Sequence, residues 1–525
     1  MHLDPNWLSA PIAIPLLTAA LGLPFIRRGL ERAAVTQNRL AGLGMLLNLA
    51  VSLLLLVYTL SDRRLVLQVG LWPAPFGITL IADAFSAIML TLTAILSLAT
   101  VVYASGTLDA RAKLNYYPLV SFLVMGVNGA FLAGDIFNLY VFFEVLLVAS
   151  FALLTLGGQV AQINGGIRYV LLNLLASTIF LATAGIIYGT LGTLNLAHIA
   201  ERMPLAPRPV QILIAGLLLV TYSSKAGLFP LFFWLPASYH TPHPSVTALF
   251  GGLLTKVGIY TLFRLYPLIF PHILQEWQTL ILTIAGLTMV TGVLGAMAVN
   301  TVRRVLSFHI ISQVGYMVMG LGLAASSDPA LAVFGMAAGI LYLVHHMIVK
   351  TALLMAGGAA EMEVSSGSLL RSRLAGLTHR QPVLGIIFFL AAMSLAGMPP
   401  TSGFISKLVL LQGAVGSAHW VIAAVSLSVS LFTLMSMIRL WQKAFWDQPE
   451  IAVGATTLLT SPRQRWLTLV PIALLVSLSL GIGIFAGSIF HWSGIAARQV
   501  MDRQGYIAAV APTDVIEYAG ANHAE

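Results

Sequence analysis

The chain has 525 residues, of which 58% are hydrophobic and only 9% charged, and its formal net charge is +9. Soluble domains carry about a quarter charged residues, so this composition excludes a water-soluble protein and predicts many membrane spans. The sequence contains no cysteine, which excludes disulfides, iron–sulfur clusters and cysteine nucleophiles. The positive charge is assigned to basic loops, and no nucleic-acid binding is expected.

Hydropathy along the chain predicts an all-α polytopic membrane protein with about fourteen transmembrane helices. The predicted spans cover residues 8–26, 40–60, 82–104, 117–133, 136–157, 167–190, 210–235, 245–266, 278–299, 304–324, 331–358, 384–414, 418–445 and 466–491. Outside them lie only a strand-like stretch at 65–72, a loop at 194–209 and a polar tail after His491. None of these could form an independent domain.

Three regions follow from this division of the chain. Residues 1–116 hold the first three spans and an external strand-like loop, 117–445 a core of spans four to thirteen, and 446–525 the last span and the polar tail.

Charges in the loops predict the orientation in the membrane. One set of loops holds sixteen basic residues and the other holds seven. The seven are Arg63, Arg64, Arg202, Arg208, Arg264, Arg498 and Arg503. Because basic loops stay in the cytoplasm, both termini are predicted to lie outside it, in a multi-pass protein of the bacterial inner membrane.

The other four of the 27 basic residues are lysines inside predicted spans, namely Lys225, Lys256, Lys350 and Lys407. Lys256 lies eleven residues into its span, which at 1.5 Å per residue is about 16 Å deep. A lysine at that depth costs roughly 2.5–3.5 kcal/mol and normally faces a bundle interior or a hydrated cavity. These lysines therefore indicate a pathway for protons or other monovalent cations.

Glu144, about eight residues into the fifth span, is the only carboxylate deep within an apolar run. Desolvation disfavours a charged lysine and an adjacent carboxylate favours it, so moving Glu144 relative to a lysine would change its proton affinity. The alternative is a static ion pair. Burying such an ion pair often costs more free energy than the attraction between its charges recovers, and here the spans hold four lysines for one carboxylate.

Two spans carry an interruption close to a lysine. Lys225 lies between Thr221-Tyr-Ser-Ser and Gly227, and Lys407 follows Met398-Pro-Pro-Thr-Ser-Gly. Broken helices at corresponding positions of two halves are typical of ion sites in transporters, because unwound backbone offers carbonyls and helix ends.

His346 and Lys350 are four residues apart and share a helix face, which is compatible with a proton relay or with a hydrogen-bonded core histidine. With two ligands and no third, this pair does not predict a metal site. Asp83 and Asp135 lie near outer span ends, where we expect them to be solvated or to cap helices. No role is assigned to His240, His243, His309 and His345.

Five stretches together resemble the D-type component of Mrp-type multisubunit sodium/proton antiporters, over nearly the whole chain. They are Gly70-Leu-Trp-Pro-Ala-Pro-Phe-Gly-Ile, Phe142-Phe-Glu-Val, Lys225-Ala-Gly-Leu-Phe-Pro, Trp234-Leu-Pro-Ala-Ser-Tyr-His and Leu253-Leu-Thr-Lys-Val-Gly. The broader class includes the antiporter-like subunits of respiratory complex I.

The resemblance implies two inverted five-helix repeats, each with one broken helix. It also implies a transporter subunit that is not an enzyme, has no cofactor, works with other subunits of an antiporter complex and moves H⁺ and a monovalent cation, Na⁺. By the same resemblance, Glu144 and Lys225 form a gating pair, Lys256 is the central carrier, His346 and Lys350 lie on the axis, and Lys407 is the terminal lysine of the second half.

Two other functions remain open at this point. One is a proton-pumping subunit of a complex I-like NADH:quinone oxidoreductase or a hydrogenase-linked complex, which would present similar lysines. The other is a membrane enzyme acting on lipid-linked substrates, which requires clustered carboxylates and arginines at one interface. The sequence does not identify the exchanged cation, its stoichiometry or the subunit that carries it.

Overall fold

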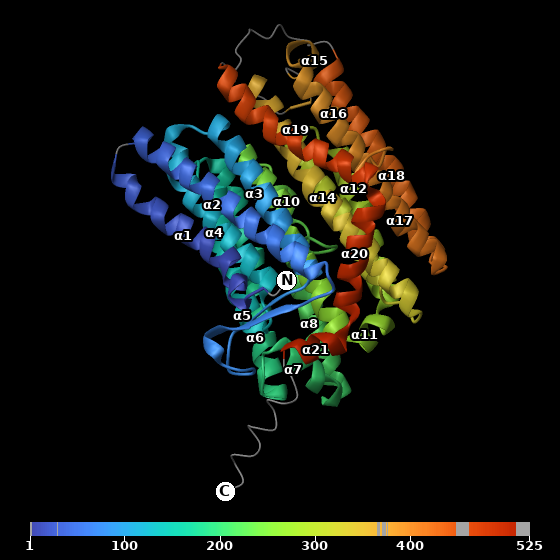
Figure 1. Cartoon of the computed structure of the whole chain (residues 1–525). Helices are drawn as coiled ribbons and strands as arrows, with labels where there is room; N and C mark the ends of the chain where they lie inside the picture. Colours follow the sequence, from blue (N-terminus) through green and yellow to red (C-terminus); the bar gives the residue numbers. More distant parts are fainter. Residues whose placement is uncertain are drawn as a thin grey trace.

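The computed structural model describes residues 3–28, 30–364, 368–369, 374, 376–447 and 461–510. These residues form a bundle of tilted helices with one small β-hairpin (Figure 1). Twelve of the described helices are long and apolar enough to cross a membrane. The predicted all-α polytopic membrane fold is therefore confirmed.

The first half of the chain contains the hairpin and the first broken helix. Its elements are α1 (Ala10–Gly22), α2 (Leu30–Thr59), β1 (Leu65–Gln68), β2 (Thr79–Ala82), α3 (Ala84–Thr107), α4 (Ala110–Leu132), α5 (Ile136–Thr155), α6 (Val160–Leu191), α7 (Leu196–Arg202), α8 (Arg208–Ala226), α9 (Trp234–Ser238) and α10 (Pro244–Ile269).

The second half contains the second broken helix and ends in two helices that pack back on the bundle. Its elements are α11 (Pro271–Glu276), α12 (Gln278–Ala298), α13 (Val302–Leu323), α14 (Pro329–Val364), α15 (Leu377–Arg380), α16 (Pro382–Ala396), α17 (Ser402–Gly416), α18 (Trp420–Trp441), α19 (Pro462–Ile484), α20 (Ala486–Met501) and α21 (Arg503–Val510).

The twelve candidate spans coincide with twelve of the fourteen predicted ones. The other two predicted spans, 117–133 and 384–414, correspond to α4 and to the α16/α17 pair, whose halves have 15 residues each. The count of fourteen and the inverted repeats stay predictions.

Both predicted interruptions are confirmed. α8 is followed by Gly227 at φ 76° and α16 by Gly397 at φ 94°, a left-handed backbone that strains any residue with a Cβ. In both cases the amide that follows the glycine donates to the carbonyl four residues before the glycine, at 2.9 and 3.0 Å. The two broken helices thus stop in the same way.

One end of the bundle, which we call the hairpin end, is formed by β1, β2, α7 and α21 (Figure 1, bottom). The predicted strand-like stretch is confirmed in β1, where Leu65 pairs antiparallel with Ala82 of β2. Arg503 of α21 donates to Ala200 O of α7, and Gln68 of β1 donates to Val510 O at 3.2 Å.

The predicted polar tail after His491 is not a tail as far as Val510, because α20 and α21 continue the chain as helices. Residues 511–525 lie outside the described residues.

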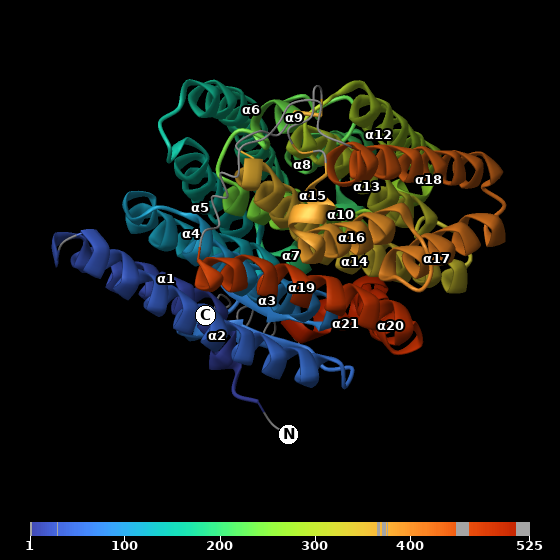
Figure 2. The same ribbon diagram turned by 90° about the horizontal axis from the view of Figure 1, so that it is seen from above.

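α10 and α14 lie near the centre of the bundle when it is seen from above (Figure 2). Every residue of α10 is buried, and so is most of α14. Side chains on these two helices are therefore the most remote from the surrounding lipid.

Candidate functional site

The four span lysines lie at two kinds of position. Lys256, midway along α10, and Lys350, on α14, are both 0% exposed. Lys225 and Lys407 lie beside the two helix breaks. The ion pairs among the described residues include none of the four, so these ammonium groups have no carboxylate counter-ion in contact.

Lys407 follows its break and lies in the second turn of α17. Its Nζ donates to Ala396 O, the last residue of α16, at 2.9 Å. This carbonyl lies at the negative end of the helix dipole, where a cation is favoured. The same Nζ lies 5.2 Å from the ring centre of Tyr316.

Lys225 instead precedes its break, in the last turn of α8. Its Nζ donates to Ser177 Oγ of α6 at 2.9 Å and lies 5.0 Å from the ring centre of Phe143. The two lysines therefore occupy opposite sides of their breaks, so they are not at corresponding positions.

Glu144 lies on the outer face of α5. Phe137, Val141 and Val148 on the same face are exposed, and Glu144 itself is half-buried. Its charge acts on Lys225, but no ion pair within 4.0 Å joins the two in the described part of the chain. Within those residues Glu144 Oε1 has no hydrogen-bond partner. The pair is thus separated rather than statically bonded.

A small cavity of about 10 Å³ lies against Lys225. Asn173, Tyr239 and Leu254 also line it. A space of this size admits about one water molecule. Since Leu254 belongs to α10, the cavity extends from Lys225 toward the helix that carries Lys256.

His346 is electrostatically coupled to both central lysines, Lys256 and Lys350. Among the described residues, Lys350 Nζ and both ring nitrogens of His346 lack a hydrogen-bond partner, although all three atoms are buried. Lys256 Nζ donates to the backbone oxygen of Gly251. Lys256, His346 and Lys350 thus form a buried cluster of basic side chains at the centre of the bundle.

The histidines His345 and His309 contact serines instead. His345 Nδ1 lies 2.7 Å from Ser402 Oγ of α17, and His309 Nε2 lies 2.9 Å from Ser436 Oγ of α18. Helical spacing predicts that His345 points away from the His346 face, and these contacts agree with that prediction.

A cavity of about 310 Å³ opens near His243, away from the hairpin end. Asp109, Gln159 and Arg303 also line it. Burial and the charge of Arg303 lower the pKa of His243 to about 3, so this histidine is neutral at cellular pH. Nearby, His240 is half-buried and its Nδ1 lies 2.9 Å from Pro236 O.

One prediction near the hairpin end is wrong, because Arg264 is not in an outer loop: α10 continues past it to Ile269. Asp83, predicted to be solvated or to cap a helix, is buried and caps α3. Arg264 Nη2 donates to Asp83 Oδ1 at 2.8 Å, and both side chains are buried. Burial alone would raise the pKa of Asp83, but the charge and hydrogen bonds of Arg264 hold it below its ordinary value.

The predicted capping role of both aspartates is confirmed. Asp83 accepts from Ser86 N at the start of α3, at 2.9 Å, and Asp135 accepts from Asn138 N at the start of α5, at 2.6 Å.

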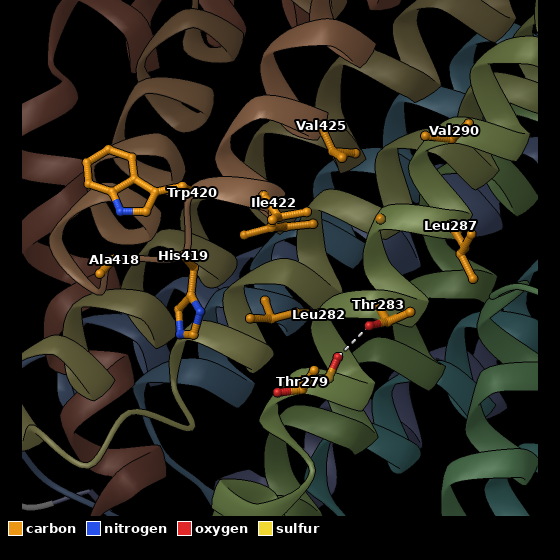
Figure 3. A pocket seen from close by; sticks show the side chains of 12 residues that line it. Thr279, Leu282, Thr283, Leu287, Val290, Ala418, His419, Trp420, Ile422 and Val425 are labelled. Atoms are coloured by element: carbon orange, nitrogen blue, oxygen red, sulfur yellow. Dashed lines mark hydrogen bonds between the residues drawn. The ribbon is translucent and has the colours of Figure 1, made fainter.

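A larger groove, of about 570 Å³, lies between α12 and α18 (Figure 3). Its wall is mainly apolar, with Leu287 and Val425 on facing helices and Trp420 at one end. His419 is the one ionisable residue of its lining. This groove is therefore separate from the buried lysines. In the part of the chain that the structure covers, no cluster of three His, Asp or Glu residues is placed to hold a metal ion.

Comparison with known proteins assigns the family. The model of the family described as NADH:quinone oxidoreductase/Mrp antiporter, transmembrane, matches residues 133–433, which include all six candidate site residues. The chain belongs to this family. The match to the family model covers α5 to α17 and most of α18, so both broken helices and the central lysines lie within the matched region.

Three relatives refine the position within the family. The D-type component of the Na⁺/H⁺ antiporter of Alkalihalophilus pseudofirmus is 42% identical over 96% of this chain and 99% of its own. The corresponding component from Bacillus subtilis is 36% identical over the same shares. A chain of the Mrp complex of Dietzia sp. superposes with a TM-score of 0.87 at 32% identity, covering 96% of this chain and 99% of that one. The resemblance to the D-type Mrp component is confirmed, and the chain is a membrane subunit of the cation/proton antiporter class.

Proposed function

We propose that this chain moves protons across the membrane within a multisubunit Na⁺/H⁺ antiporter, along the residues Glu144, Lys225, Lys256, His346, Lys350 and Lys407. The observation that carries the proposal is the buried set of lysines without carboxylate partners. Lys256 and Lys350 are completely buried at the centre of the bundle, where no ion pair among the described residues includes either of them.

An isolated ammonium ion in this environment is costly. Its full desolvation would cost tens of kcal/mol in a dry medium, and buried groups avoid that cost by becoming neutral. A lysine that is neutral for most of the time and charged only when a proton arrives is a carrier. A permanently charged structural lysine would instead require a paired carboxylate, which Lys256 and Lys350 do not contact.

Glu144 acts in this proposal as the element that changes the proton affinity of Lys225. In the described state Lys225 bonds the neutral hydroxyl of Ser177, and Glu144 acts on it only through space. A closer approach of the carboxylate favours the charged lysine, and withdrawal favours proton release toward the cavity beside Leu254. Movement of α5 relative to α8 thus gates proton transfer.

The position of Glu144 also supports assembly with other subunits. A carboxylate at the middle of α5, among exposed apolar side chains, is unfavourable in contact with lipid. A neighbouring protein surface would remove that cost. The relatives are named as subunits of a Na⁺/H⁺ antiporter and of an Mrp complex, from which we take the partners and sodium as the exchanged cation.

The second candidate is a proton-pumping subunit of a redox-linked complex. It is favoured by the matched family model, whose description covers NADH:quinone oxidoreductases as well as Mrp antiporters. The two functions differ in the energy source that drives the protons.

Everted membrane vesicles that contain the whole complex separate the two candidates. We impose a pH gradient, follow it with a fluorescent amine, and add either NaCl or an electron donor. The antiporter function predicts that NaCl dissipates the gradient and that the donor alone does not change flux through this complex. Proton movement that follows the donor and ignores Na⁺ would assign the chain to a redox-linked pump.

A further inference from the structure

The second broken helix carries a chain of buried hydroxyl groups that none of the proposed axis residues accounts for. His345 Nδ1 lies 2.7 Å from Ser402 Oγ, which lies 2.7 Å from Ser479 Oγ, and this oxygen lies 2.8 Å from Ser394 Oγ. All four side chains are at most 2% exposed. The chain therefore has three consecutive contacts of hydrogen-bonding length in a dry part of the bundle.

Four helices contribute to this chain. His345 belongs to α14, Ser402 is the first residue of α17, Ser394 lies in the last turn of α16, and Ser479 belongs to α19. Ser479 therefore joins the two halves of the broken helix through its single hydroxyl group. No other described residue links Ser394 to Ser402 by side-chain hydrogen bonds.

The backbone of α19 is built to approach the break at this point. Gly483 follows Ser479 by one helical turn and faces the same side. A Cβ atom at Gly483 would lie 2.0 Å from Pro400 O, inside the break, so only glycine permits this contact. Ser479 and Gly483 together form a surface of α19 fitted to the interrupted backbone.

A chain of hydroxyl groups can pass a proton without a net change in any of them. When a proton arrives at Ser394 Oγ, the hydroxyl proton of Ser394 moves to Ser479. The hydroxyl proton of Ser479 then moves to Ser402, and that of Ser402 moves to His345 Nδ1. The imidazole then gives its Nε2 proton to a neutral base of the central cluster. Rotation of the hydroxyls and a flip of the imidazole ring, which returns the N–H group to Nε2, restore the first state. His345 Nε2 is buried and has no hydrogen-bond partner among the described residues, so the proton acceptor has to approach it during transport.

We propose that Ser479 is a positioning residue of the proton path, which orients Ser394 and Ser402 across the break so that His345 exchanges protons with the α16/α17 end of the axis. The inference rests on the proposed function. Lys407 also contacts this break through Ala396 O, and its charge acts on His345. The hydroxyl chain thus runs from a histidine beside the central cluster to the last turn of α16, where Lys407 donates to Ala396 O.

The test compares Ser479→Ala, Ser479→Val and Ser479→Thr in the whole complex, reconstituted in proteoliposomes. Valine and threonine have nearly the same shape, but only threonine keeps the hydroxyl group. Loss of one net hydrogen bond of ordinary strength corresponds to a change of roughly fivefold. We expect Na⁺-driven proton flux to fall at least about fivefold in the alanine and valine variants. The threonine variant should stay within about twofold of the original.

Two reference variants make the outcome unambiguous. Ser477→Ala removes an exposed hydroxyl from the same helix and should leave flux unchanged. Lys256→Met tests the axis itself. Normal flux in Ser479→Ala beside lost flux in Lys256→Met would overturn the relay while the proposed function stands. Equal loss in the threonine and valine variants, at normal assembly, would also overturn it. If Ser479→Ala does not assemble, Ser402→Ala is measured in its place with the same expectation.

Discussion

Lys225→Arg should abolish Na⁺-driven proton movement although it preserves the positive charge. Arginine does not release its proton at any accessible pH, so a carrier lysine cannot be replaced by it. A shift of about 2.7 kcal/mol in a protonation equilibrium already changes the fraction of protonated side chains roughly a hundredfold, and the higher pKa of arginine shifts this equilibrium further. The guanidinium group would also have to fit beside Ser177 and Phe143, where Lys225 Nζ now lies. Flux in reconstituted complex is the measurement.

The matched control for this substitution is Lys113→Arg. Lys113 lies in the first turn of α4, outside the central cluster, and its Nζ donates to Ser105 O. Its replacement should leave flux within about twofold of the original. If Lys225 were one partner of a static structural pair, arginine would still pair and transport would persist. Near-normal exchange in Lys225→Arg at the original expression level would therefore contradict the gating role of Lys225.

Asp83→Ala should produce the largest loss of stability among single substitutions of charged residues near the hairpin end. It leaves Arg264 buried without its carboxylate, which typically costs about 3–5 kcal/mol. It also removes the cap of α3, where Asp83 accepts from Ser86 N. Thermal unfolding of the purified complex in detergent measures the effect as a lower midpoint or a lower yield of assembled protein.

Asp502→Ala is the matched control for this effect. Asp502 pairs with Arg64 at 3.0 Å, but half of its side chain is exposed, and exposed pairs contribute about 0–1 kcal/mol. The double variant Asp83→Leu, Arg264→Met should recover most of the lost stability, because neither charge then stays buried alone. An Asp83→Ala complex as stable as the Asp502→Ala complex would show that the buried pair is not a stabilising feature.

Sequence patterns were sufficient for features that depend on local chemistry. Apolar runs of about 20 residues predicted the spans, and Gly227 and the Met398-Pro-Pro-Thr-Ser-Gly stretch predicted the two breaks. The separation of His345 from His346 followed from helical spacing alone. These features need no knowledge of which helices are neighbours.

Contacts between distant parts of the chain were missed, because they depend on which helices are neighbours. Asp83 and Arg264 are 181 residues apart, and only their packing shows that they pair. The available signal was Arg264 itself, an arginine within the apolar Leu262-Phe-Arg-Leu-Tyr. Ser479 is one of several serines in its span, and nothing in its neighbourhood distinguishes it until α19 is placed against the break.

The helical structure of the last described residues was also missed, because these residues have a polar composition. α20 has one apolar face, and its residues after His491 were assigned to a polar tail. Gln499 secures this helix by accepting from Ala84 N at 2.7 Å. Contacts of this kind depend on where α3 begins, which the sequence alone did not specify.

The central claim is that protons cross the membrane through the buried lysines of this chain. The most direct test reconstitutes the whole complex in proteoliposomes, imposes a Na⁺ gradient and records internal pH for the original chain, for Lys256→Met and for Lys113→Met. Methionine keeps the length and removes the charge, so both variants should assemble. We predict that Lys256→Met reduces proton flux to that of liposomes without protein, while Lys113→Met stays near the original rate. Unchanged Na⁺-driven flux in an assembled Lys256→Met complex would contradict the account.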